Sequence, residues 1–141
     1  MTLTLETAQK IITTALAKGR ELELKPLTVA VLDAGGHLKA LAREDGTSTL
    51  RPDIAQGKAN GAIAMGLGSR AIFKRAQEQP FFVQAMNGLA KGALVPVPGG
   101  VLIRDESGIV GAVGITGDTS DNDEICAIAG IEAVGLSADP G

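Results

Sequence analysis

Apolar residues recur at helical spacing near the start of the chain. Leu5, Ala8 and Ile12 lie about one turn apart, and polar or charged side chains fill most positions between them. Such a stripe is typical of a helix that buries one face. Thr4 precedes the stripe, and threonine is a common N-cap residue. The pattern predicts a helix from Leu5 to Glu21.

Two pairs of β-rich segments predict two hairpins. The first pair is residues 27–32 and 37–43, joined by the turn Asp33-Ala34-Gly35-Gly36, and the second is residues 101–103 and 109–115, joined by Asp105-Glu106-Ser107-Gly108. Glycine in such turns adopts positive φ at little cost. In the 37–43 segment the polar side chains alternate with apolar ones and lie mainly on one face. Both hairpins indicate an antiparallel sheet.

Helical segments lie between and after the hairpins. Pro52 suits the first turn of a helix that runs to about Met65 and carries glycines and alanines on one side. A basic helical stretch follows at residues 70–78, and Pro80 begins another short segment. A final helix is predicted over residues 120–136, with residues 140–141 as a tail. Its own side chains are apolar nearly all round, which places it in the core or in a subunit interface. Helices segregated around an antiparallel sheet make a layered α+β domain.

Composition narrows the function classes. The 141 residues predict one domain, residues 1–141, with a sizeable core. Three phenylalanines are the only aromatic side chains apart from one histidine, and the net charge is −3. Few rings are therefore available to stack on bases, and no basic footprint is present, so we expect no nucleic-acid partner.

The cysteine count and the first residues of the chain indicate which metal sites and which cellular location to expect. The single cysteine, Cys126, excludes an internal disulfide and a cysteine-rich metal site, and one histidine adds too little for a zinc site, so we expect no metal. The first residues lack the basic and apolar regions of a signal peptide, and no apolar run reaches membrane-spanning length. We expect a cytoplasmic protein with no membrane partner.

Three residues are candidate acid–base groups. His37 follows the first predicted turn, where an imidazole can exchange protons near neutral pH or bind a metal or haem iron; a surface or turn-stabilising histidine is the alternative. Asp33 lies in the same turn. Asp118 follows the last predicted strand and can serve as a general base. We take Asp33, His37 and Asp118 as the candidate catalytic residues.

Charged residues near the first hairpin suggest an anion site. Arg43 and Lys58 can clamp an anionic ligand beside Asp45, although solvated surface charge explains the same residues equally well. Ser120 and Asp123 form a capping-box pattern at the start of the final helix, so we assign Asp123 to a cap. The string Gly66-Leu-Gly-Ser-Arg-Ala71 matches a dinucleotide fingerprint, but a helix precedes it where that motif needs a strand, so we interpret it as a helix break.

The ordered blocks of this chain resemble a known family, the GlcG/HbpS-like proteins (DUF336), which include the C-terminal domain of PduO proteins. The matching blocks are residues 29–38, 43–45, 55–59, 98–100 and 111–117, followed by Asp123-Glu124. The resemblance implies a profilin-like α+β fold, a five-stranded antiparallel sheet flanked by helices. It also implies homo-oligomers, from dimers up to octamers. Some members bind haem, and the family is often labelled haem-degrading.

The resemblance also directs attention to residues at the family's pattern positions. The candidate ligand-binding residues are Arg43, Asp45, Lys58, Gly99, Gly100, Thr116 and Gly117. The leading hypothesis is an oligomer that binds a small molecule, with haem or another tetrapyrrole as the most concrete ligand and His37, Met65 or Met86 as its axial ligand. The alternatives are a cofactor-free enzyme acting on a small organic acid or aldehyde, and a structural or protein-interaction module.

Overall fold

The computed structural model describes residues 2–141. Five helices and five strands follow one another along the chain. In order they are α1 (Leu5–Glu21), β1 (Thr28–Asp33), β2 (Leu38–Arg43), α2 (Arg51–Met65), α3 (Ser69–Glu78), α4 (Pro80–Leu89), β3 (Gly100–Asp105), β4 (Gly108–Thr116), α5 (Ser120–Ala133) and β5 (Ser137–Asp139).

The strands form one antiparallel sheet in the order β2-β1-β4-β3-β5. Along the central pair, Thr28 lies opposite Thr116, and Asp33 lies opposite Gly111. These pairs mark two ends of the sheet, which we call the Thr28 end and the Asp33 end. Both predicted hairpins are confirmed, and so is the α+β class with its five-stranded sheet.

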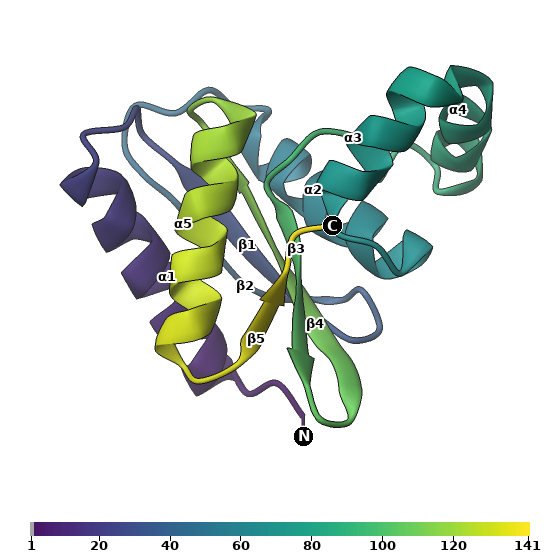
Figure 1. Cartoon of the computed structure of the whole chain (residues 1–141). Coiled ribbons are helices and arrows are strands. Elements are labelled where there is room, and N and C mark those ends of the chain that lie inside the picture. Colours follow the sequence, from purple (N-terminus) through teal and green to yellow (C-terminus); the bar gives the residue numbers. More distant parts are fainter. Residues whose placement is uncertain (1) are drawn as a thin grey trace.

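Helices cover both faces of the sheet (Figure 1). α1 and α5 lie side by side on one face, over the main core, which includes Val29, Val31 and Ile115. α2 lies on the other face, where Leu32 and Leu102 pack against its alanines. Alternate residues of each strand therefore point into different layers, as the pleat requires.

α2 approaches the sheet closely because both surfaces carry small residues. Ala55, Gly57, Ala59 and neighbouring small side chains of α2 are buried. On the sheet, a Cβ at Gly114 would lie 1.9 Å from the Ala55 carbonyl oxygen, so no side chain fits there. Ala55 and Ala59 of the predicted small-residue face thus meet β4, whereas Gly57 and Gly61 lie against Val95 and Leu94.

Two details at the C-terminal end of the chain differ from the sequence prediction. The final helix ends at Ala133 instead of residue 136, and residues 137–139 add β5 to the sheet edge beside β3. The N-cap of α5 is Thr119, whose hydroxyl accepts from the Asn122 amide, and not Ser120. Thr119 has the extended backbone conformation of an N-cap residue, which lets its hydroxyl accept from an amide in the first turn of the helix.

α3 and α4 form an arm that extends from the three layers (Figure 1). α4 packs against α3 and contacts no other helix or strand of the described chain. A small apolar cluster holds the two helices together, centred on Ile72, Val83 and Leu94. Within residues 2–141, no helix has both the length and the hydropathy needed to cross a membrane.

We expect Gly114→Ala to lower the free energy of unfolding by at least about 2 kcal/mol, because the added methyl must push α2 away from β4. Gly88, near the end of α4, has open space around its would-be Cβ. Gly88→Ala is therefore the matched control, and it should leave stability unchanged or raise it by about 0.5–1 kcal/mol. Urea denaturation measures both values. Equal effects of the two substitutions would contradict the close approach.

Candidate functional site

A buried ion pair joins α2 to α5 at the Thr28 end. The Lys58 ammonium donates to Asp123 Oδ2 at 3.1 Å and to the Ile115 carbonyl at 2.9 Å. The two side chains are 2% and 1% exposed. Burial lowers the pKa of Lys58, while the Asp123 charge opposes that shift. Burial likewise raises the pKa of Asp123, and Lys58 opposes it.

This pair changes the interpretation of two candidate residues. Lys58 is enclosed and already bonded, so the predicted clamp of Arg43 with Lys58 on an anion does not form. Asp123 does assist the turn before α5, since its Oδ1 accepts from the Asp118 amide at 3.0 Å. Its second oxygen, however, pairs with Lys58, a role that the capping-box pattern does not predict.

Gly99 and Gly100 make room for this pair. Gly99 has a φ of +119°, and a Cβ there would lie 2.9 Å from the Lys58 nitrogen. A Cβ at Gly100 would lie 2.3 Å from the Lys58 carbonyl oxygen. The Gly100 amide donates to the buried Ser69 hydroxyl at 2.7 Å. In the structure, these two candidate ligand-binding glycines contact the protein's own chain.

Asp118 ties two loops together. Its carboxylate accepts from the backbone amides of Lys25 and Thr119 and from the Asn122 side chain. These bonds, led by that from Asn122, lower the pKa of Asp118 to about 2. A carboxylate so well supplied with donors is a poor proton acceptor near neutral pH. Beside it, Gly117 has a φ of +142°, and a Cβ there would lie 2.2 Å from the Pro26 carbonyl oxygen.

Thr116 has a partner that the sequence analysis missed. The Arg51 guanidinium donates to its hydroxyl at 2.7 Å. Arg51 is the first residue of α2, immediately before Pro52. A cation is an unusual choice at this position, because the positive end of the helix dipole lies there. An arginine at this unfavourable position was therefore the sequence feature that could have pointed to a specific role for Arg51.

Arg43 and Asp45 lie on the surface beside a shallow pocket of about 390 Å³, which Arg20, Pro26 and Glu44 complete. Glu44 is committed within this group, since it accepts from the Leu27 amide at 2.8 Å and pairs with Arg20 at 3.3 Å. The pocket therefore holds charges of both signs, and its acidic side chains disfavour an anion.

Asp33 and His37 come together at the other end of the sheet. Asp33 Oδ1 accepts from the amides of Gly35 and His37, each at 3.0 Å, and lies 3.3 Å from His37 Nδ1. The amide of His37 is the chief cause that lowers the pKa of Asp33. The imidazole is 81% exposed. It borders a pocket of about 310 Å³ whose apolar lining includes Leu3, Ile109 and Val110.

The three candidate catalytic residues do not converge. Asp33 and His37 share one end, whereas Asp118 follows the opposite end of β4. Five residue steps of β1 separate the two ends, a distance of roughly 16 Å at the usual strand rise. Within residues 2–141, no three histidine, cysteine or acidic side chains lie close enough to hold a metal ion. The sequence from Gly66 to Ala71 links α2 to α3, so it lacks the strand that a dinucleotide fingerprint needs.

We expect Lys58→Met to lower the free energy of unfolding by about 3–5 kcal/mol at pH 7, because Asp123 is left buried and charged. A carboxyl whose folded pKa is raised gains stability below its unfolded pKa and loses it as pH rises through the folded pKa. The loss should therefore be smaller at pH 4 than at pH 7. Urea denaturation at both pH values measures this.

Lys58→Met combined with Asp123→Leu is the companion variant. It should lose less stability than the sum of the two single substitutions, because neither charge is left alone. Additive losses would contradict a coupled pair.

Comparisons with known proteins cover nearly the whole chain. The family model described as haem degrading protein HbpS-like matches residues 3–132. An uncharacterised 15.0 kDa protein of Citrobacter freundii, from the dhaT-dhaS intergenic region, is 28% identical over 89% of this chain and 87% of its own.

Solved structures show the same fold. A complex of PduOC with haem superposes with a TM-score of 0.87 at 21% identity, over 97% of this chain and 98% of PduOC. A double mutant of Streptomyces reticuli HbpS has a TM-score of 0.81 at 26% identity, over 96% and 88% of the two chains. Because the family model matches residues 3–132 of the 141, the chain belongs to the HbpS-like family.

Proposed function

We propose that this chain is a haem-binding member of the HbpS-like family and that His37 supplies the axial ligand. The observation that carries the proposal is the setting of His37, an exposed imidazole with Nδ1 beside Asp33 and Nε2 free for iron. A carboxylate on the second nitrogen orients a ligating histidine and raises its basicity. Family membership and the haem complex of PduOC support the choice of ligand.

The surroundings of His37 fit one face of a tetrapyrrole. Ile109 is partly exposed beside the imidazole, and Leu3 and Val110, which are nearly buried, complete the apolar lining of the pocket. The pocket of about 310 Å³ is at the lower limit for sites that enclose a drug-sized ligand, which range over roughly 300–1,000 Å³. A macrocycle bound there by one chain would remain partly exposed, so a second chain completes the site in this proposal.

Binding is better supported than acid–base catalysis on a small acid or aldehyde. That alternative needs a carboxylate clamp close to a proton shuttle. Lys58 is bonded to Asp123, and Asp118 lies at the opposite end from Asp33 and His37. Asp33 and His37 share one pocket, but neither Arg43 nor Lys58 lines it.

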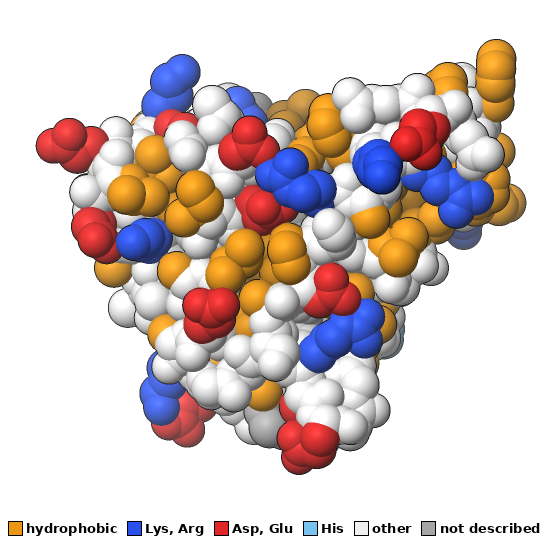
Figure 2. Space-filling model, viewed as in Figure 1, with side chains coloured by type: hydrophobic (Ala, Val, Ile, Leu, Met, Phe, Trp, Pro, Cys, Tyr) orange, Lys and Arg blue, Asp and Glu red, His pale blue; other side chains and the backbone are white. Residues whose placement is uncertain are grey.

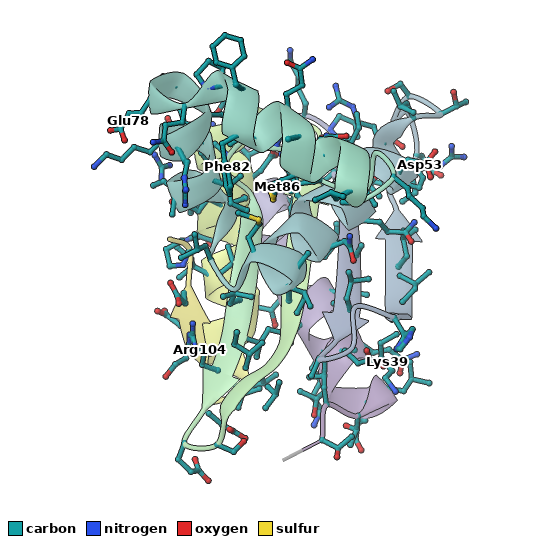
Figure 3. All side chains as sticks on the ribbon, turned by 90° about the vertical axis from the view of Figure 1, so that its right-hand side faces the viewer. Lys39, Asp53, Glu78, Phe82, Met86 and Arg104 are labelled. Carbon is teal, nitrogen blue, oxygen red and sulfur yellow. The ribbon has the colours of Figure 1, made fainter. Side chains whose placement is uncertain are left out.

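The arm of α3 and α4 is the proposed contact between subunits. Phe82 and Met86 lie along one side of α4 (Figure 3) and join the cluster beneath it. Phe81 and Leu89, at the two ends of α4, remain 85% and 77% exposed. Hydrophobic side chains also gather over this arm at the upper right of Figure 2. An exposed apolar helix on a projecting arm is typical of a surface that a second copy covers.

Titration with hemin tests the ligand assignment. The wild-type protein should bind hemin and shift its Soret band, and His37→Ala should abolish or weaken that shift by at least about tenfold, since no other imidazole is present. Met65→Leu and Met86→Leu are matched controls that should retain wild-type binding. The proposal fails if hemin causes no shift, or if His37→Ala shifts the band as the wild type does.

Sedimentation analysis tests the contact between subunits. We expect the wild type to sediment as an oligomer and Phe81→Asp combined with Leu89→Lys to sediment as smaller species, because charges replace the apolar contact. Leu22→Asp, on an exposed residue after α1, is the control and should keep the wild-type mass. A monomeric wild type, or an unchanged mass in the double variant, would contradict this interface.

A further inference from the structure

A second pocket opens at the Thr28 end, between the loop before α2 and the loop after β4. We call it the Arg51 pocket; its lining is Lys25, Pro26, Gly46, Thr47, Ser48, Arg51 and Gly117. Its volume is about 260 Å³, below the range typical of drug-sized ligands. The lining contains two cations and two hydroxyls and no acidic residue.

Within the described chain, the two cations of this pocket have no direct ion-pair partner. Arg51 bonds to the Thr116 hydroxyl, and within residues 2–141 no carboxylate lies at ion-pair distance from either Arg51 or Lys25. The neighbouring Asp118 carboxylate accepts three hydrogen bonds, one of them from the Lys25 amide, and its charge offsets part of the Lys25 charge but leaves Arg51 without an ionic partner among the described residues. α2 also begins here without a side-chain cap, so its dipole adds to the positive potential.

A buried hydroxyl lies on the same face of the sheet as Thr116, the residue to which Arg51 is bonded. Thr28 lies directly opposite Thr116, so both side chains are on the face of the sheet that α2 covers. Thr28 is fully buried, and its Oγ1 has no hydrogen-bond partner in the described chain. An orphaned buried hydroxyl costs about 1–3 kcal/mol. Because Thr28 is fully buried and does not line the Arg51 pocket, this hydroxyl marks strain beside Thr116 and is not itself a ligand contact.

We propose that the Arg51 pocket binds a small organic acid through its carboxylate. A guanidinium donates two parallel bonds to a carboxylate, which explains why arginine occupies the wall of the pocket. Ser48 and Thr47 can bond to a hydroxyl or oxo group next to that carboxylate. The limited volume restricts the ligand to a short acid, such as a 2-hydroxy or 2-oxo acid.

This site is distinct from the proposed haem site. It lies at the opposite end of the sheet from His37 and uses none of the same residues. The two proposals therefore succeed or fail separately, since hemin absorbance reports on His37, whereas amide signals of Gly46, Thr47 and Gly117 report on the Arg51 pocket.

Titration of the ¹⁵N-labelled protein with lactate and pyruvate at constant ionic strength tests the proposal. We expect saturable shifts of the Gly46, Thr47 and Gly117 amide signals. Lactamide, which has the same shape without the charge, should cause none. Arg51→Gln should weaken binding by about tenfold or more, because it removes charge-assisted bonds. Arg51→Lys, which retains the charge but not the fork, should be intermediate.

Lys25→Gln acts on an exposed side chain, so it should weaken binding several-fold in a folded protein even if Arg51→Gln fails to fold. Lys74→Gln, an equal charge change on the exposed surface of α3, should leave affinity unchanged. The proposal is overturned if neither acid binds, if lactamide binds equally, if inorganic phosphate binds more tightly than both acids, or if Lys25→Gln has no more effect than Lys74→Gln.

Discussion

The buried contact of Lys58 with Asp123 is the constraint on which the other features of this fold depend. Lys58 belongs to the helix on one face of the sheet, and Asp123 belongs to a helix on the other. Their side chains meet past the end of β4, where Lys58 also bonds the Ile115 carbonyl. The link therefore joins all three layers. It requires glycine at positions 99 and 100, where a Cβ would meet Lys58.

That requirement explains the glycines better than a binding role does. Gly99 leaves space for the Lys58 ammonium, Gly100 for the backbone of α2 and Gly114 for the start of the same helix. A buried ion pair contributes little net stability compared with an apolar pair of the same shape. We infer that the pair contributes specificity, because a placement of α2 against α5 that separates the two groups leaves both charges buried and unpaired. The glycines and the ion pair thus specify one arrangement together.

Local patterns predicted most of the elements and none of the long-range pairings. α1 begins and ends where the sequence predicts, because its apolar stripe and Thr4 cap are local signals. β5 was missed because three residues, Ser-Ala-Asp, carry no β-pattern and pair only once β3 is in place. The partner of Lys58 was missed for a related reason. Asp123 is 65 positions away, and a carboxylate in the first turn of a helix matches a cap equally well.

The same limit applies to the candidate sites. An enzyme acting on a small acid would need Asp33, His37, Arg43, Lys58 and Asp118 to meet in one pocket. The register places them at two ends of the strands instead. At one end an imidazole is held by the turn that precedes it. At the other, Asp118 and Lys58 are bonded within the fold, and Arg51 is one of the cations there that has no carboxylate at ion-pair distance within residues 2–141. In this chain, a structural residue has its polar atoms bonded within the fold, whereas a candidate binding residue keeps polar atoms that a ligand can reach.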